Sequence, residues 1–410
     1  MARITWLVVC GVLLQAAPQQ PTFRTTTALV QVDAIVLDDN GNFVPSLGPD
    51  DLTLYENGQV QKIEQFYLVT HDPVARASSI AADEAGRPAE GAHRVFVMMF
   101  DSGHLGAEGL MRVKKGAESF IMEHIGPGDV SGVLVNGELH QSRLTTDKGA
   151  LLSGVRAAKP LIDTRESLLA PFREFPRIPS EHDAMRVADG ARELTNRLGV
   201  KACQDSPWEP DCNMPGAIQY VENKIQVKAR LYVRQARILT AQTVQSIQAL
   251  VASLGKYAGR KTIVLMSEGF YSIEARATLE KLAGQAARAG VTIYSIDGRG
   301  LINRSAGNTD AVRADPGRSL TFDSGDDGPN ILTAGTGGFM VQGTDDMKAA
   351  FSRIARDTST YYVIGYQPSN PTMDGKFRKI EVKAKANGVT VRARKGYLAT
   401  TLPPQEAIWR

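Results

Sequence analysis

Polar side chains follow three apolar segments of the sequence, each at the point where the apolar run stops. The runs and their polar ends are 95–100 before Asp101-Ser102-Gly103, 262–266 before Ser267-Glu268-Gly269, and 291–296 before Asp297. Continuous apolar runs of this kind are typical of buried parallel strands. Because loops and helix N-termini converge at the carboxyl ends of such strands, ligands bind at that edge of an open sheet. The pattern therefore predicts a binding edge that includes Asp101, Glu268 and Asp297.

The residue types at this edge favour oxygen donation to a cation or polar partner over covalent catalysis. The sequence has no Gly-x-Ser-x-Gly, His-Glu-x-x-His or Gly-x-x-x-x-Gly-Lys segment, and the glycine-rich stretch 335–338 precedes a strand instead of following one. His104 is close to Asp101, but a single histidine in a loop is more often a surface residue than a base. We expect a protein that is not an enzyme; a hydrolase assembled from residues distant in sequence is the alternative.

The segments around these runs alternate between helical and strand patterns. Apolar periodicity predicts a helix at 110–124, strands at 130–135 and 139–144, and a helix at 279–289. Such alternation is typical of a parallel sheet with helices on both faces. We therefore predict an α/β fold with a doubly wound, mostly parallel sheet over residues 93–358.

Both ends of the chain have the alternating apolar pattern of half-buried strands. An N-terminal β unit is predicted at 28–70 and C-terminal strands at 359–398, while 71–92 has no periodicity and is predicted to be a linker. Each set alone has too few strands to bury a core. We expect the two sets to pack together as a small β-sandwich.

An insertion at about 160–256 interrupts the α/β pattern and ends in a predicted helix of about 217–256. One face of this helix is apolar, and the other carries basic residues that include Arg230, Arg234 and Arg237. Two interpretations stay open, a solvated face balanced by acidic residues elsewhere, and a docking surface for an acidic partner. A net charge of +3 over 410 residues is too weak to indicate a nucleic-acid partner across the whole surface, so any basic site must be local. We expect no nucleic-acid partner for the basic helix, because the protein is predicted to be exported.

The N-terminus is typical of an export signal, with Arg3, an apolar run at 4–14 and small residues before Pro18. We predict a signal peptide at 1–17 with cleavage near Ala17, a secreted or periplasmic protein, and no integral membrane span, because the run is shorter than the roughly 20 residues that a span needs. A buried first strand and a lipid anchor at Cys10 are the alternatives. Cys203 and Cys212 then predict one disulfide, with free thiols or half of a metal site as alternatives.

The order of these units resembles a von Willebrand factor type A domain, and the whole chain resembles the VWFA-related Acidobacterial domain family. The segments that carry the resemblance are Asp101-Ser102-Gly103, Ser267-Glu268-Gly269, Leu52-Thr53-Leu54-Tyr55-Glu56-Asn57-Gly58, Leu144-Thr145-Thr146-Asp147, Ile296-Asp297, Thr336-Gly337-Gly338, 361–368 and Arg392-Ala393-Arg394-Lys395-Gly396-Tyr397. The resemblance implies the type A fold and a divalent cation at the carboxyl edge of the sheet.

In type A domains an Asp-x-Ser-x-Ser loop, a threonine and a further aspartate hold that cation. Asp101 matches the first position, but Gly103 and Leu105 replace both serines, so Ser102 supplies an oxygen only after a shift of register. Glu268 stands where the aspartate is expected. The resemblance thus implies a degenerate site, with Asp101, Ser102 and Glu268 as weak ligands for Mg²⁺ or Ca²⁺ and no certain cofactor.

The function expected from this resemblance is binding of a protein partner through the carboxyl edge, where His104 and Asp297 are further contact candidates. The alternative is a metal-independent envelope scaffold that docks through Arg230, Arg234 and Arg237 of the basic helix.

Overall fold

A computed structural model describes residues 29–71, 94–161, 165–257, 259–270, 275–301 and 327–403. The predicted signal peptide lies outside these residues, and so does nearly all of the predicted linker. No helix within the described ranges combines the length and the apolar character that a membrane span requires.

The central sheet has six strands in the order β10-β9-β8-β5-β6-β7. The strands are β5 (Val95–Phe100), β6 (Val130–Val135), β7 (Glu138–Leu139), β8 (Lys261–Ser267), β9 (Val291–Asp297) and β10 (Met340–Val341). All neighbours are parallel except β6 and β7. The mostly parallel α/β sheet is therefore confirmed. The strand expected at 139–144 stops at Leu139, because Gln141 and Ser142 adopt positive φ angles of 56° and 55° that no strand continues through.

Helices cover both faces of this sheet. Successive residues of β5 point to opposite faces, so that Phe96, Met98 and Phe100 join one hydrophobic cluster and Val95, Val97 and Met99 join the other. The first face packs against α2 (Ala107–His124), α3 (Lys148–Ala157) and α11 (Met347–Ser359). The second face packs against α8 (Arg276–Arg288), α10 (Asp327–Thr336) and the C-terminal half of α7 (Ala217–Leu254).

Strands from both ends of the chain form two further sheets, each with four antiparallel strands. One has the order β13-β1-β11-β4, with β13 (Val389–Ala393), β1 (Val30–Asp38), β11 (Thr360–Tyr366) and β4 (Ile63–Thr70). The other has the order β14-β12-β2-β3, with β14 (Gly396–Leu398), β12 (Phe377–Ala384), β2 (Leu52–Glu56) and β3 (Gln59–Gln61). Val32, Leu54, Ile364 and Ile380, from four of these strands, share one hydrophobic core.

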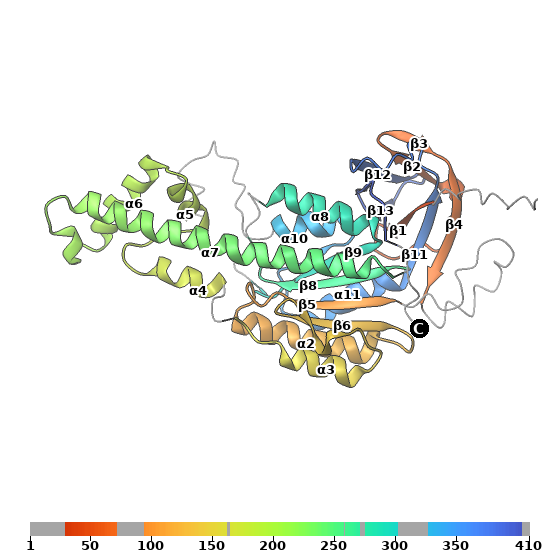
Figure 1. The fold of residues 1–410 in the computed structure, drawn as a ribbon, viewed down its shortest axis with the longest axis horizontal. Coiled ribbons are helices and arrows are strands. Elements are labelled where there is room, and N and C mark those ends of the chain that lie inside the picture. Colours follow the sequence, from red (N-terminus) through yellow and green to blue (C-terminus); the bar gives the residue numbers. More distant parts are fainter. Residues whose placement is uncertain are drawn as a thin grey trace, which may run out of the picture.

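The insertion forms a helical arm made of α4 (Arg165–Leu169), α5 (Glu181–Ala188), α6 (Arg192–Asp205) and the N-terminal half of α7. Figure 1 shows these helices gathered at one end of the molecule, while the antiparallel strands lie at the other end. The two halves of α7 pack into different cores: Val221, Ile225 and Tyr232 into the arm, Ile247 and Leu254 against the central sheet. At 38 residues, α7 is about 57 Å long and joins the arm to the body.

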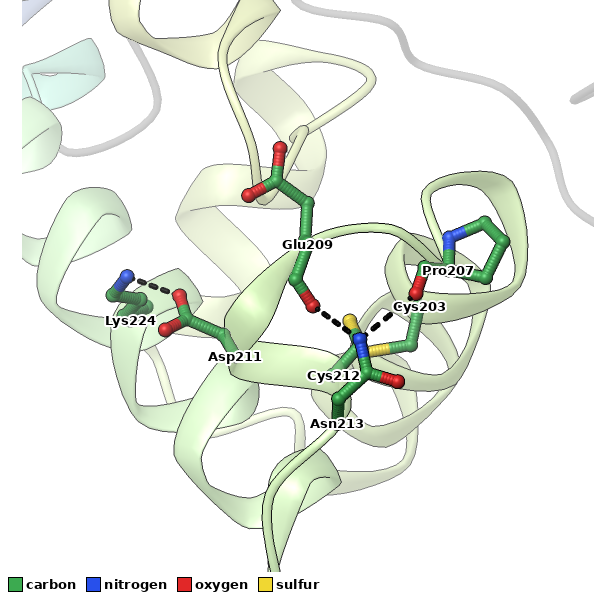
Figure 2. Close-up of a disulfide and its surroundings, with 7 residues drawn as sticks. All are labelled: Cys203, Pro207, Glu209, Asp211, Cys212, Asn213 and Lys224. Atoms are coloured by element: carbon green, nitrogen blue, oxygen red, sulfur yellow. Dashed lines mark hydrogen bonds and ion pairs between the residues drawn. A yellow bond between two sulfur atoms is a disulfide. The ribbon is translucent and has the colours of Figure 1, made fainter.

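The predicted disulfide between Cys203 and Cys212 is present and joins the end of α6 to the short 3-10 helix Pro210–Cys212 (Figure 2). The side-chain amide of Asn213 donates to the carbonyl oxygens of Pro207 and Glu209, both at 3.0 Å. Lys224 of α7 pairs with Asp211 in the same loop. The bridge and these contacts hold the loop before α7, and a closed loop of this size stabilises by about 2–3 kcal/mol in the chain-entropy model.

Candidate functional site

Asp101, the first residue after β5, is the centre of a buried hydrogen-bond cluster. Its backbone N–H donates to the carbonyl oxygen of Met266 at 3.0 Å and so extends the pairing of β5 with β8 by one residue. Its carboxylate accepts the hydroxyl protons of Thr243 and Ser267, each at 2.8 Å. The side chain of Asp101 is only 4% exposed. Because each hydroxyl occupies a different carboxylate oxygen, the cluster fixes the orientation of the side chain.

His104 completes this cluster from the loop that follows Asp101. Its Nδ1 lies 3.1 Å from both carboxylate oxygens and 3.2 Å from Oγ1 of Thr243. The carboxylate favours the tautomer in which Nδ1 carries a proton and donates it to Asp101. Both hydroxyls are bonded to the carboxylate instead of Nε2, so the histidine does not activate either of them as a nucleophile. These hydrogen bonds hold the loop that follows β5 in one position.

Helix α7 covers the loop that contains Asp101. A Cβ added to Gly103 would lie 3.2 Å from Cδ2 of Leu239, one helical turn before Thr243. All residues from Asp101 to Gly106 are buried. Ser102 is among them, with its hydroxyl 3.5 Å from the carbonyl oxygen of Phe100. Asp101, Ser102 and His104, which were expected at an open binding edge, are therefore buried beneath the helix that carries the arm.

Glu268 and Asp297 lie at the same edge but belong to separate contacts. The backbone N–H of Glu268 donates to the carbonyl oxygen of His104 at 2.7 Å. The carboxylate of Glu268 lies over Gly109 in the first turn of α2, where an added Cβ would be 2.0 Å from Oε1. Negative charge is favourable at a helix N-terminus. Asp297 is fully buried and pairs with Arg299, at 2.8 Å between Oδ2 and Nη2.

The oxygens around Asp101 do not fit a divalent cation in this arrangement. No group of three or more His, Cys, Asp or Glu side chains that could hold a metal occurs within the described ranges. One carboxylate and two hydroxyls are oxygen ligands of the type that Mg²⁺ takes. Here, however, the protons of Thr243, Ser267 and His104 already point at the carboxylate. The hydroxyl oxygens keep free lone pairs, but the carboxylate already accepts three donors, so His104 at least would have to leave it before a cation could bind there.

Sequence patterns did not identify Thr243 as a site residue, because it is separated from Asp101 by 142 positions. The only local signal is a hydroxyl on the apolar face of a predicted helix. The sequence did indicate Ser267, as the first polar residue after the apolar run 262–266. Its hydrogen bond to Asp101, however, depends on the pairing of β5 with β8.

The basic face of α7 divides into structural and exposed residues. Lys228 donates to the carbonyl oxygens of Pro171, Glu174 and Pro176 at 2.8–3.1 Å, and its partial burial lowers its pKa. Arg230, Arg234 and Arg237 are exposed on the same helix. Lysines of the basic face thus help to hold the arm together, whereas the arginines face solvent.

Large apolar side chains are exposed on α7 beside these arginines. They are Tyr220 at 42%, Val227 at 57%, Leu231 at 58% and Ile238 at 44% exposure. We call these four residues the α7 stripe. Their spacings of 7, 4 and 7 residues place them within about 40° of one another around the helix, so they form one continuous face.

Neither the family models nor the curated proteins searched include a match to this chain.

Proposed function

We propose that this chain is an exported, non-enzymatic protein-binding module with a type A fold and a small β-sandwich from its two ends. The partner docks on the arm, through the α7 stripe and its neighbouring arginines. The single observation that carries this proposal is the exposure of four large apolar side chains along one face of a helix. Exposed apolar faces with a polar rim mark interaction surfaces.

The charge beside the stripe selects the kind of partner. Arg230 and Arg234 are exposed, and neither forms an ion pair with a carboxylate in the part of the chain that the structure describes. Antiparallel pairing of two α7 stripes would place Arg234 opposite Lys224, and parallel pairing would place each arginine opposite itself. Repulsion between like charges at these positions disfavours docking of a second copy of this chain on the α7 stripe. The partner that fits is an amphipathic helix with acidic residues beside its apolar face.

The carboxyl edge supports a second candidate, in which a partner binds through a degenerate cation site at Asp101. The observation in its favour is the convergence of three oxygen-bearing side chains, Asp101, Thr243 and Ser267, at the edge where type A domains bind. This candidate requires α7 to move and His104 to release the carboxylate. Isothermal titration with Mg²⁺, Ca²⁺ and Mn²⁺ tests it. We expect no saturable heat at millimolar ion, whereas binding that is lost in Asp101→Ala would favour this candidate over arm docking.

Reversing the charge beside the stripe is expected to weaken docking of an acidic helix at least tenfold. The probes are two designed amphipathic peptides with the same apolar face and either glutamates or lysines beside it, measured by fluorescence anisotropy. The acidic peptide is expected to bind the wild-type protein and to lose affinity for the variant Arg230→Glu/Arg234→Glu, because two favourable contacts become repulsive. The lysine peptide is expected to show the opposite preference.

Arg197→Glu is the matched control, because Arg197 is exposed on α6 of the same arm. It is expected to leave both affinities unchanged. Equal binding of the two peptides to the wild-type protein, or equal loss in the control, would contradict docking at the α7 stripe.

A further inference from the structure

A second candidate site lies at the amino ends of the central strands, opposite the Asp101 cluster. A cavity of about 140 Å³ separates the starts of β8 and β9 from the outer face of the sheet formed by β13, β1, β11 and β4. Its lining includes Arg94, Arg260, Arg392 and Arg394, and among the lining residues that the structure describes Asp33 is the one acidic residue. We call this space the arginine cavity.

Three of these arginines have a carboxylate partner. Arg94 donates from Nε to Asp129 at 2.9 Å, and Arg392 donates from Nη1 to Asp357 at 3.0 Å. Arg260 lies 3.5 Å from Asp33, stacks on the ring of Tyr361 and donates from Nη2 to the hydroxyl of Tyr294 at 2.9 Å. These contacts neutralise three of the four guanidinium charges.

The fourth arginine and a neighbouring lysine hydrogen-bond to carbonyl oxygens and pair with no carboxylate within the described residues, although Arg394 also lies over the ring of Tyr397, 5.5 Å from its centroid. Arg394 donates from Nη1 to the carbonyl oxygen of Ala287, a residue of the cavity lining. Lys261 donates to the carbonyl oxygen of Tyr257 at 2.8 Å and lies against Gly290, which also lines the cavity. Burial lowers the pKa of both side chains, which reflects the cost of holding their charge in this place.

Several buried donors at the cavity are also unsatisfied. Within the described residues, Nη1 of Arg260 and Nε of Arg394 have no hydrogen-bond partner, while Nε of Arg260 has only its 3.5 Å ion pair with Asp33. A buried donor without a partner costs free energy, and the cost is larger for a charged group. Two unsatisfied guanidinium nitrogens and a surplus of positive charge therefore occur at one cavity.

We propose that the arginine cavity binds a small tetrahedral oxyanion, with phosphate as the best match. Phosphate has a charge between −1 and −2 at neutral pH and several strong acceptor oxygens, which suits the unsatisfied nitrogens of Arg260 and Arg394 and the charge of Lys261. The available space holds several water molecules or one small ion, and it is well below the roughly 300–1,000 Å³ of pockets for drug-sized ligands. The ligand is thus an ion or a small phosphate-bearing group, and not a nucleotide.

A bound ion would connect two parts of the fold. It bridges Arg260, at the start of β8, to Arg394, immediately after β13. These two residues belong to the parallel and the antiparallel parts of the fold, respectively. Occupancy is therefore expected to tie the two parts together and to raise the unfolding temperature.

Titration of the full chain with inorganic phosphate tests the proposal, by calorimetry and by thermal unfolding at constant ionic strength. Phosphate and sulfate are expected to bind saturably and to raise the unfolding temperature, while acetate binds at least tenfold more weakly. Arg394→Gln is expected to lower phosphate affinity at least tenfold. Gln31→Glu, at an exposed position of the lining, is a second variant that adds negative charge without removing a buried contact, and it is expected to lower the affinity in the same direction.

Arg197→Gln is the matched control, because it makes the same change on the exposed face of α6. It is expected to bind phosphate as the wild-type protein does. Absence of saturable phosphate binding, acetate binding as tight as phosphate binding, or unchanged affinity in Gln31→Glu would overturn the proposal. None of these results depends on whether a partner docks on the arm.

Discussion

The variant Asp101→Ala is expected to lose about 3–5 kcal/mol of unfolding free energy, the typical cost of removing one partner from a buried charged contact. The carboxylate accepts protons from Thr243, Ser267 and His104, all of them buried. Its removal leaves three donors without an acceptor in a place that water does not reach. Urea or guanidinium unfolding followed by circular dichroism measures the change.

Loss of this cluster is also expected to loosen α7 where it crosses the carboxyl edge. Thr243 anchors the helix to Asp101, and Leu239 packs on Gly103 one turn earlier. Hydrogen exchange at residues 239–243 is therefore expected to accelerate in Asp101→Ala more than exchange in β1 or β11. Asp39→Ala removes an exposed carboxylate and serves as the control, with a change below about 0.5 kcal/mol. A loss of less than about 1 kcal/mol in Asp101→Ala would contradict a structural role for this cluster.

Stability is expected to rise between about pH 8 and pH 10.5 because of Lys261. Burial lowers the pKa of this side chain from its ordinary value of 10.5 to about 8, with partial compensation from the charge of Asp33. A lowered pKa means that the folded state binds fewer protons than the unfolded state in this range, so unfolding becomes less favourable as pH increases. Below pH 8 the protein bears the full cost of the buried charge, about 3 kcal/mol for a shift of this size.

Lys261→Met removes the titrating group and isolates this effect. The difference in unfolding free energy between the wild-type protein and this variant is expected to grow in favour of the wild type by about 3 kcal/mol from pH 7 to pH 10.5. Tyrosines that titrate at high pH are common to both proteins and cancel in the difference. Lys379→Met makes the same change at an exposed lysine and serves as the control. The measurements use phosphate-free buffers, so that no phosphate binds in the arginine cavity. A difference in unfolding free energy between the wild-type protein and Lys261→Met that does not change with pH would contradict the prediction.

Local patterns were sufficient for the elements whose signal lies within a short stretch of chain. The apolar runs at 95–100, 262–266 and 291–296 form buried parallel strands, because a strand covered on both faces needs apolar residues at every position. The apolar spacing over 217–254 gives one long helix, and the cysteines at 203 and 212 are close enough to pair. The prediction of a strand at 139–144 was wrong beyond Leu139, because a turn with positive φ angles ends the strand there.

Short-range patterns were therefore enough to predict the α/β class, the long helix and the residues that end each strand. The packing of distant elements decided that α7 crosses the carboxyl edge and buries Asp101 beneath Thr243. It also decided that Arg260 and Arg394, more than a hundred residues apart, line one cavity. Both arrangements have the same cause: periodicity records which side of an element is apolar, but the neighbour of a polar side chain depends on how distant elements pack.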